Sequence, residues 1–473
     1  MKLYIELIRL IFRKFILRWN NGQAIKEFAE NMGITYIKLA QILATQNIGN
    51  IFTEDDRKSL SKICDTCKPI DFDEIRNILK VEYGNNLTSN FKYIYNNPIG
   101  SGSVSQVHKG ILKDGTKVAI KIKRKDISNQ VQNDIKRLKI IIKRYGKIFH
   151  FRNFKGAFIA LDLYLDWIYQ EIDFNNEMKN MEIYSNYVNS VNDKIKGVKK
   201  LKVPKLYKEF CTDNVIVMEY IDYSTINKMK LTDRNKTKIV NAINSYIKLN
   251  FWAMFNDKQI IFHGDPHSAN LAIDNDDNLY FLDMGLIFIL TNDEANLCRD
   301  FFITIYTKDY EKLFKMLIIY SNLDHKSKNK FKQDCKKYIT SIENKNITHY
   351  FIDIIGICLK YEFTPPTFFF NMAKSFICIY GISNFSNNDI SVVNLLSDQT
   401  LEFMIKRNIN NNKKIIITII NNLLNIIDNT KDLDIISILV SQLTNVELTN
   451  NLNQSITDFN TLFNVLKSSL QKK

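Results

Sequence analysis

The chain has 473 residues, of which 45% are hydrophobic and 24% charged, and it carries a formal net charge of +15. Length and composition predict a globular protein of two or three domains with ample material for a core. The positive charge accompanies abundant Lys and Asn but no RGG run, zinc finger or aromatic-basic platform, so no nucleic-acid partner is expected.

The cysteines predict a reducing, intracellular compartment, because they are seven, an odd number, and scattered along the chain. Cys64 and Cys67 form a C-x-x-C pair, but no second pair or nearby His completes a zinc site. A membrane span needs about 18 consecutive apolar residues, and the sequence has no such run. The stretch 415–427 is shorter and contains three Asn.

Residues 1–21 predict an amphipathic and mostly basic helix. Lys2, Glu6, Arg9 and Arg13 recur at spacings of four, three and four between apolar residues. Such a helix docks onto the rest of the protein, lies on an anionic membrane surface or acts as a targeting segment. A membrane-surface or mitochondrial location is therefore compatible with the sequence, and a lipid surface is a candidate partner. Protein partners are not predicted.

Helices are predicted over residues 22–90, and a set of short β-rich runs follows. The runs are 93–95, 104–112, 117–122, 203–207 and 215–220. Asp114 and Gly115, between two of these runs, are a hairpin signal, and residues 127–190 predict a long polar helical stretch. After Tyr220 the pattern is helical to the last residue, apart from short apolar pieces at 260–262 and 279–282.

The most informative stretch runs from His263 to Gly285 and reads H-G-D-P-H-S-A-N, then twelve residues, then D-M-G. Phosphoryl transfer requires a carboxylate beside the acceptor hydroxyl and oxygen ligands for Mg²⁺ on the phosphates. Asp265 would orient or deprotonate the acceptor, and Asn270 would hold one metal ion. Asp283 would hold the metal ion that bridges the β- and γ-phosphates.

Two further features of this stretch concern its local structure. The apolar pieces on either side of the polar turn 274–278 predict a hairpin that brings Asn270 and Asp283 together. His263 and His267 are expected to orient the loop rather than to bind a metal ion.

A second signal lies upstream, where a V-A-I-K run ends at Lys121. This pattern predicts a strand lysine that contacts the α- and β-phosphates. One hairpin earlier, a loop of small residues lets backbone N–H groups approach phosphate oxygens. Glu219 and Tyr220 follow a Val-Ile-Val strand and are expected to meet the adenine as a hinge. The predicted cofactors are ATP and Mg²⁺. The loop consists of Ile99, Gly100, Ser101, Gly102, Ser103 and Val104.

Lys121 requires an acidic partner, and three candidates lie close together in the sequence. Asp173 and Glu177 are four residues apart and would share one face of a helix, whereas Glu171 would point elsewhere. A solvent-exposed acidic helix is the alternative interpretation.

The order of helices, a small sheet and more helices, together with these motifs, predicts an α+β, two-lobed protein-kinase-like fold. It has a small antiparallel β-sheet N-lobe, a helical C-lobe, and helical N- and C-terminal extensions. The expected segments are a basic amphipathic helix at 1–21, a helical extension at 22–90, the N-lobe at 91–219, the C-lobe at 220–390 and a C-terminal helical extension at 391–473.

These residues resemble the UbiB/ADCK atypical kinases, which are tied to coenzyme Q and other isoprenoid-lipid metabolism. Lys38-Leu39-Ala40-Gln41 is similar to that family's K-x-G-Q motif, and the loop at 98–108 is similar to its Ala-rich nucleotide loop. Glu171-Ile172-Asp173 is similar to its E-x-D motif, with Glu177 at the place of the glutamate that pairs with the strand lysine. The H-G-D-P-H-S-A-N loop is similar to its H-x-D-P-H-x-x-N loop.

The resemblance implies a gate over the site. The helices that carry Lys38 and Gln41 would pack over the usual peptide site, and Lys38 would approach the carboxylates of Glu171 and Asp173. The sequence supports this separately, because Lys38 is the only charge in a mostly apolar predicted helix and a buried lysine requires a partner.

Two positions depart from the family's pattern. Ala40 stands where the family has Gly and adds a methyl group where helices touch. Gly100, Ser101 and Gly102 replace the family's alanines, so the loop is closer to that of ordinary glycine-rich kinases. Since glycine permits closer phosphate contact, productive ATP binding is expected and protein kinase activity stays open.

Almost no activation segment separates Gly285 from the next predicted helix near Asn292, which disfavours a peptide substrate. The leading interpretation is an atypical kinase or ATPase that binds Mg-ATP and acts on, or is regulated by, a lipid or small molecule. The alternatives are a Ser/Thr protein kinase, a relative of aminoglycoside or choline kinases, and a nucleotide-binding regulatory pseudokinase with little turnover. The phosphoryl acceptor is not predicted.

Overall fold

The computed structural model describes residues 20–46, 69–145, 154–256, 259–306, 308–341 and 347–386, with a few single residues before 20 and between 53 and 59. All of them belong to residues 1–397, the first of two compact units into which the chain divides. The pair Cys64 and Cys67 and the predicted extension at 391–473 lie outside the described residues, as does most of the predicted basic helix.

A four-stranded antiparallel sheet with the strand order β1-β2-β3-β5 forms the N-lobe. The predicted hairpin joins β2 and β3, and Gly115 at its turn has a φ of +92°, a conformation that favours glycine. The first strand is longer than predicted and has irregular pairing near Pro98. The strands are β1 Phe91–Ser101, β2 Ser105–Leu112, β3 Lys117–Lys123 and β5 Val215–Glu219.

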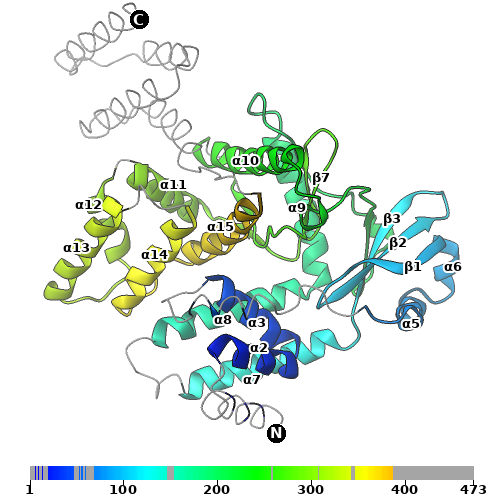
Figure 1. The fold of residues 1–473 in the computed structure, drawn as a ribbon, viewed down its shortest axis with the longest axis horizontal. Helices are drawn as coiled ribbons and strands as arrows, with labels where there is room; N and C mark the ends of the chain where they lie inside the picture. Colours follow the sequence, from blue (N-terminus) through cyan, green and yellow to red (C-terminus); the bar gives the residue numbers. More distant parts are fainter. Residues whose placement is uncertain are drawn as a thin grey trace, which may run out of the picture. The chain divides into compact units, whose positions relative to one another are not determined.

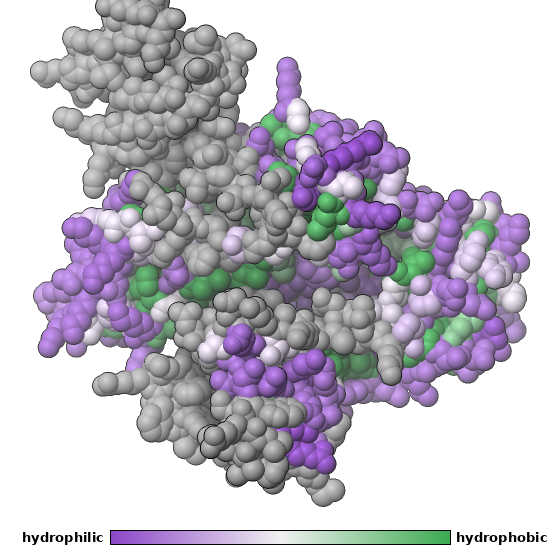
Figure 2. All heavy atoms as spheres, in the orientation of Figure 1, coloured by the Kyte–Doolittle hydropathy of each residue, from purple (hydrophilic) through white to green (hydrophobic). Residues whose placement is uncertain are grey.

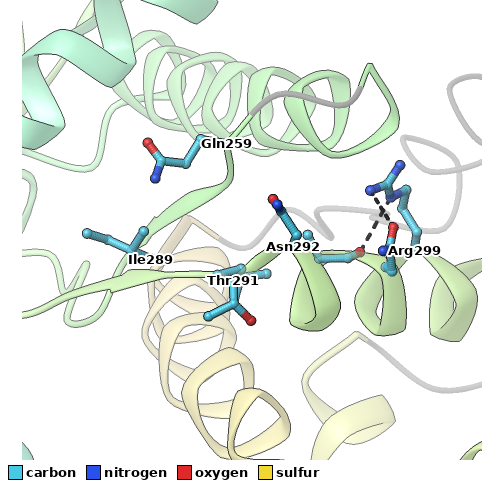
Figure 3. Close-up of a pocket in the computed structure, with 8 residues that line it drawn as sticks. Gln259, Ile289, Thr291, Asn292 and Arg299 are labelled. Atoms are coloured by element: carbon cyan, nitrogen blue, oxygen red, sulfur yellow. Dashed lines mark hydrogen bonds between the residues drawn. The ribbon is translucent and has the colours of Figure 1, made fainter.

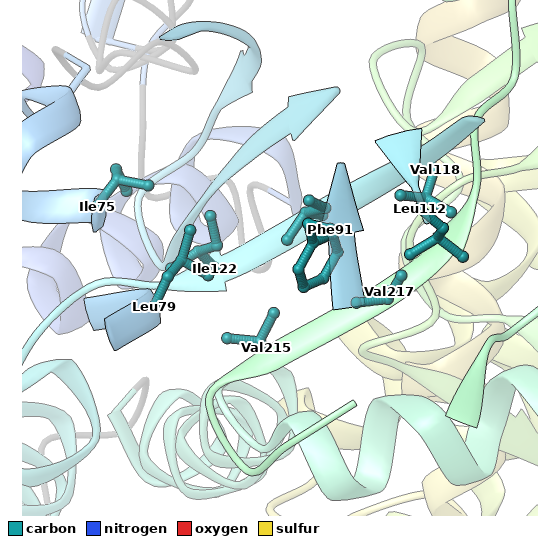
Figure 4. Packing of buried hydrophobic residues seen from close by; sticks show 9 residues of the cluster. Ile75, Leu79, Phe91, Leu112, Val118, Ile122, Val215 and Val217 are labelled. Carbon is teal, nitrogen blue, oxygen red and sulfur yellow. The ribbon is translucent and has the colours of Figure 1, made fainter. Parts of the chain in front are cut away.

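One face of this sheet is covered by helix α5, Phe72–Tyr83. Ile75 and Leu79, four residues apart on the helix, are buried against apolar side chains from all four strands (Figure 4). Those strand residues are Phe91, Leu112, Val118, Ile120, Ile122, Val215 and Val217. Because side chains alternate along a strand, the residues between them, Lys121 among them, point to the opposite face.

The predicted strand at 203–207 is wrong. Strand β4 is Leu201–Lys202, which pairs in parallel with β8. Residues 203–207 form no strand and meet β5 only through a bridge between Leu206 and Met218. Pro204 has no N–H to donate to a strand ladder, which explains why the strand stops there.

Three helices fill the stretch predicted as one long helical region, and α9 is the one that faces the sheet. Asp173 caps α9, since its side chain accepts hydrogen bonds from the N–H groups of Asn175 and Asn176. The helices are α7 Ile127–Tyr145, α8 Phe154–Glu171 and α9 Phe174–Val191.

The C-lobe is mainly helical and has two small strand pairs, one of which β4 extends to a three-stranded sheet in the order β4-β8-β7. β7 and β8 form the predicted hairpin, and β6 pairs with a strand that was not predicted, β9. The strands are β6 Ile261–His263, β7 Leu271–Ile273, β8 Leu279–Phe281 and β9 Ile287–Ile289. The helices are α10 Asp233–Phe255, α11 Asn292–Tyr306, α12 Tyr310–Ile318, α13 His325–Ser341, α14 Ile347–Lys360 and α15 Thr367–Ser386.

Helix α13 shows how the C-lobe divides into core and surface. Phe331, Cys335, Tyr338 and Ile339 recur at helical spacing and are buried, while the lysines between them face outward. Figure 2 shows mainly hydrophilic residues over this part of the molecule.

Helices α2, Asn21–Met32, and α3, Ile34–Gln46, form a pair that lies beside α7 and α8 (Figure 1). Ala40 is 1% exposed and packs with Ala29, Met32 and Tyr36, so its methyl group fills the contact between the two helices. Helix α3 also contacts α15 of the C-lobe.

Two residues of the predicted basic helix are placed by their contacts with α2. Arg13 forms an ion pair with Glu27, and the buried Glu6 accepts a hydrogen bond from Asn31 at 3.1 Å. Of the three roles predicted for residues 1–21, these contacts support docking onto the rest of the protein. Within the described residues, none of the helices combines the length and hydrophobicity that crossing a bilayer requires.

The architecture confirms the predicted α+β fold with a small antiparallel N-lobe sheet and a helical C-lobe. The boundaries predicted for the five segments stay predictions.

Candidate active site

Strand β3 and helix α9 bring Lys121 and Glu177 together under the sheet. The ammonium group of Lys121 donates to both carboxylate oxygens of Glu177, at 2.6 and 2.8 Å, and Glu177 is 1% exposed. Burial raises the pKa of Glu177 to about 7, and the Lys121 ammonium opposes that shift. Burial by itself would lower the pKa of Lys121, but the carboxylates of Asp283 and Glu177 hold it above its usual value.

Asp283 completes this cluster from the C-lobe. Its Oδ2 accepts a hydrogen bond from Lys121 at 2.8 Å, and its Oδ1 accepts one from the N–H of Gly285 at 2.9 Å. Lys121 and the Gly285 N–H hold the pKa of Asp283 well below its usual range, against the effect of burial. A Cβ at Gly285 would lie 3.4 Å from the Cα of Glu171, so glycine lets the end of α8 approach closely.

The β7–β8 hairpin places Asn270 beside Asp283, as predicted: Leu282 N–H donates to the Asn270 carbonyl at 2.9 Å. The Asn270 amide nitrogen donates to the Asp265 carbonyl at 3.2 Å, which leaves the amide oxygen as the atom that can bind a cation. A carboxylate and an amide oxygen are hard ligands of the kind that Mg²⁺ prefers, so this pair fits the expected metal.

His263 links the two parts of the site. Its Nε2 donates to the carbonyl of Asp283 at 2.5 Å, and its Nδ1 accepts from the N–H of Asp265 at 3.1 Å. A carbonyl can only accept and an N–H can only donate, so the neutral ring carries its proton on Nε2. Burial lowers the pKa of His263 to about 4. The predicted orienting role of His263 fits this geometry.

Asp265 is surrounded by charged and polar side chains. Its Oδ1 is 3.3 Å from Nζ of Lys374 and accepts a 3.4 Å hydrogen bond from the thiol of Cys378, both on α15. Its Oδ2 is 3.8 Å from Nε2 of His267. Burial raises the pKa of Asp265, but Lys374, followed by His267 and Lys38, outweighs burial and holds it well below its usual range.

The sequence analysis did not single out Lys374, although the pattern that singled out Lys38, a lone charge in an apolar helix, also applies to Lys374. Each is the only charged residue in an otherwise uncharged helix, Lys38 in α3 and Lys374 in α15. A buried lone lysine requires a partner, and this rule would have singled out both.

The predicted gating contact is present between Lys38 and Glu171, which form an ion pair that is largely shielded from solvent. Glu171 raises the pKa of Lys38 above its usual value, against the effect of burial. Asp173 has a different place from the one predicted, since it caps α9 instead of sharing a helical face with Glu177. Gln41 lies one turn from Lys38 in α3, and its side chain is outside the described part of the structure.

The predicted nucleotide loop, residues 99–104, comprises the end of β1 and the turn to β2, and its Ser101 hydroxyl contacts both Arg124 and Gln106. Arg124 donates from Nε to the Gly102 carbonyl and from Nη2 to the Ser101 hydroxyl, each at 3.0 Å. Gln106, fully buried, exchanges two hydrogen bonds with the backbone of Ile70, at 2.9 and 3.1 Å.

Two residues on the same face of the sheet as Lys121 were missed by the sequence analysis. Val107 is the cross-strand partner of Lys121, so both side chains leave the sheet on the same face. Ala119, two residues before Lys121, shares that face. A sequence signal for Val107 was present. In the glycine-rich loop pattern G-x-G-x-x-G-x-V the valine comes five positions after the second glycine, as Val107 does after Gly102.

The two predicted hinge residues lie at the end of β5. The Glu219 N–H donates to the Lys205 carbonyl at 2.8 Å, and the Glu219 carboxylate accepts from the Lys205 N–H at 3.2 Å. The ring of Tyr220 lies 4.2 Å from the ammonium group of Lys109.

A cavity of about 670 Å³ lies elsewhere, between the loop before β6 and the start of α11 (Figure 3). Gln259, Ile289, Thr291 and Asn292 line it together with Arg299, which donates to Asn296. None of these residues belongs to the cluster around Lys121 and Asp265.

Residues 62–317 match the ABC1 atypical kinase-like domain. The chain belongs to this family. The match includes the lysine, carboxylates and amide of the site, but Lys38 and Lys374 lie on either side of the matched residues. The ABC1 domain therefore receives both of these lysines from flanking helices.

Two relatives of this ABC1 chain are 28% and 25% identical to it. Activity of BC1 complex kinase 7, chloroplastic, from Arabidopsis thaliana, is 28% identical over 300 residues, 62% of this chain and 41% of the relative. A Shewanella woodyi protein named probable protein kinase UbiB is 25% identical over 327 residues, 67% of this chain and 57% of the relative. The chain thus spans about half the length of these two relatives.

A solved structure, the Rv3197–erythromycin complex from Mycobacterium tuberculosis, resembles the ABC1 chain with a TM-score of 0.45 and 16% identity. The likeness covers 74% of this chain and 86% of that one.

Proposed function

We propose that this ABC1 protein binds Mg-ATP beneath the N-lobe sheet and transfers or hydrolyses its γ-phosphoryl group, with a lipid or small molecule as acceptor or regulator. The observation that carries the proposal is the cluster in which Lys121 contacts Glu177 and Asp283, with Asp265 and Asn270 on the adjoining loop. Phosphoryl transfer depends mainly on placing such charges around the phosphates.

Each group has a distinct task in the proposed reaction. Lys121, kept protonated by two carboxylates, would contact phosphate oxygens. Asp283 and Asn270 would hold Mg²⁺, which neutralises phosphate charge when bound. Asp265, kept ionised by its neighbours, would accept the hydrogen bond of the attacking hydroxyl or water. It would take that proton as the new bond to phosphorus forms and the bond to the ADP oxygen breaks.

A small acceptor is favoured over a peptide by the elements around Asp265. After Gly285 the chain enters β9 and then α11 at Asn292, so no long segment is left to hold a peptide. The Lys38–Glu171 pair brings helix α3 to the end of α8 close to the same loop. An organellar location is part of the proposal, because several relatives are named chloroplastic.

Phosphate release from ATP by the purified protein with Mg²⁺ tests the proposal, with and without phospholipid vesicles or a phenolic mimic of a lipid headgroup. We expect turnover in the wild type and a large loss, about 100-fold or more, in Asp265→Asn, because general-base positioning contributes about 10²–10⁴ to such rates. A stimulation by vesicles or by the phenol would distinguish the two classes of small acceptor or regulator.

Nucleotide binding provides the second measurement. Asp283→Asn is expected to abolish Mg²⁺-dependent ATP binding, whereas Asp276→Asn, the same change at an exposed position in the hairpin, leaves it unchanged. Tight binding without turnover in the wild type would favour a regulatory nucleotide-binding protein. Mg²⁺-dependent binding that survives in Asp283→Asn would contradict the metal role of Asp283.

A further inference from the structure

Lys374 is a buried cation that the proposed chemistry has not used. It lies in the middle of α15, and its side chain is 7% exposed. An ammonium group that loses its hydration needs strong partners in return.

The partners of Lys374 come from the catalytic loop and from the end of α8. Its Nζ donates to the Gly264 carbonyl at 2.9 Å and lies 3.3 Å from Oδ1 of Asp265. The same atom is 3.9 Å from Oε1 of Glu171. Lys374 therefore stands between the carboxylate at the acceptor position and the carboxylate of the gate.

The other oxygen of Glu171 is bound by Lys38 of α3. The result is a row of alternating charges, in the order Lys38, Glu171, Lys374 and Asp265. Buried charge networks in which each group has partners on both sides hold their members in one arrangement.

We propose that Lys374 is a positioning residue that fixes the Asp265 carboxylate at the acceptor site and links it, through Glu171, to the helix α3 that covers the site. The inference rests on the proposed function of Asp265. It predicts that a change at Lys374 displaces the Asp265 carboxylate and the loop that carries it.

The groups that face Asp265 come from four elements. They are Lys374 and Cys378 of α15, His263 and His267 of the loop region, Lys38 of α3 and, beyond Lys374, Glu171 of α8. Of these, Lys374 lies nearer to the Asp265 carboxylate than His267 does, with its Nζ 3.3 Å from Oδ1 against 3.8 Å between Nε2 of His267 and Oδ2. Removing the lysine should therefore leave the carboxylate free to move.

Ser375 is the comparison for a residue that only attaches α15 to the catalytic loop. Its hydroxyl donates to the His263 carbonyl at 2.5 Å, so it also ties α15 to the loop but carries no charge.

The test compares kcat and KM for ATP turnover in Lys374→Gln, Lys374→Arg and Ser375→Ala. We expect Lys374→Gln to lower kcat by about tenfold or more with the KM for ATP nearly unchanged, because a displaced Asp265 leaves nucleotide binding intact. Lys374→Arg should restore kcat, and Ser375→Ala should lower it less than Lys374→Gln does. A wild-type kcat in Lys374→Gln would overturn the inference.

A second measurement does not depend on turnover. Urea unfolding midpoints of Lys374→Gln, Asp265→Asn and the double variant form a cycle, and we expect the double variant to lose less than the sum of the single losses. Strictly additive losses would show that the two groups are not coupled and would overturn the inference. Absence of wild-type turnover would instead contradict the proposed function, and the cycle would still decide whether Lys374 holds Asp265.

Discussion

The ring of His263 forms hydrogen bonds to the backbone of Asp265 and of Asp283, the two aspartates that the proposed chemistry needs. One nitrogen bonds to the Asp283 carbonyl and the other accepts the Asp265 N–H, so the two aspartates are placed relative to each other by one rigid group. This arrangement works only with a neutral ring, because a proton on Nδ1 would face the N–H of Asp265.

The neutral state of His263 predicts a particular pH dependence of stability. Its pKa is about 4 in the folded protein and about 6.5 when unfolded, so the unfolded chain binds more protons between these values. The free energy of unfolding should therefore fall as the pH falls from about 6.5 to 4, by up to about 1.4 kcal/mol per pH unit from this residue.

Urea unfolding at pH 7, 6 and 5 measures this effect against His263→Gln. Glutamine also offers one donor and one acceptor, but it does not titrate in this range. The wild type should lose more stability than the variant between pH 7 and pH 5. Equal losses would mean that another group is responsible.

At the scale of single elements, the nucleotide loop has Gly100 and Gly102 where the resembled family has alanine, and alanine substitutions can show what these glycines contribute. A Cβ at Gly100 would lie 3.9 Å from Val107, and a Cβ at Gly102 would lie 3.6 Å from the Ser105 carbonyl, which are ordinary contacts. Neither glycine has a positive φ, so the loop itself accepts alanine at both positions.

The double substitution Gly100→Ala and Gly102→Ala should therefore leave the free energy of unfolding equal or raise it by up to about 1 kcal/mol, since alanine restricts the unfolded chain. It should weaken ATP binding by about tenfold, or ~1.4 kcal/mol, because methyl groups keep the loop backbone away from the phosphates. Isothermal titration with Mg-ATP measures the affinity, and unchanged binding would contradict a close phosphate contact.

Gly110→Ala is the control for the stability measurement, because it is the same substitution at a β2 position outside the nucleotide loop. Its Cβ would lie 2.5 Å from Cδ1 of Ile120 in the N-lobe core, so overpacking should cost about 1–3 kcal/mol of stability.

Strand prediction failed in two places, at residues 203–207 and at β9, for different reasons. In the run 203–207, Pro204 cannot donate to a ladder, and only the bridge between Leu206 and Met218 forms beyond it. Strand β9 is only Ile287–Ile289, and its pairing with β6 brings together segments that the catalytic loop and the hairpin separate. Three residues are too few for a periodic pattern to reveal a strand.

Across the whole molecule, helix α3 connects the N-terminal extension to both lobes. It packs on α2, α7, α8 and α15, and its Lys38 reaches the carboxylate at the end of α8. The predicted gate would thus rest on contacts between elements that are far apart in the sequence.

Lys38→Ala should loosen this gate. Glu171 would keep Lys374 at 3.9 Å, so the loss of stability should be moderate, about 1–2 kcal/mol, less than for a buried carboxylate left with no cation. Phosphate release in the absence of an acceptor should rise as water gains access to Asp265. Thermal unfolding and basal turnover measure the two effects.

Lys26→Ala on α2 is the control for that variant, because its pair with Glu30, at 3.7 Å, is a partly exposed i, i+4 contact. Such pairs contribute about 0.3–0.5 kcal/mol. If Lys38→Ala matches this control in both stability and basal turnover, the gating role of Lys38 is wrong.

The sequence by itself determined the family, the fold class and the residues that we propose to bind the phosphates, because each depends on short contiguous segments. The strand that ends at Lys121, the D-x4-N loop and the hairpin before Asp283 have local geometry that follows from residue type and spacing. Only the tertiary structure decided that Glu171 lies between Lys38 and Lys374 and that Lys374 Nζ lies 3.3 Å from Oδ1 of Asp265. These contacts join helices from opposite ends of the chain, and the helical period tells which face is apolar but not which distant helix packs against it.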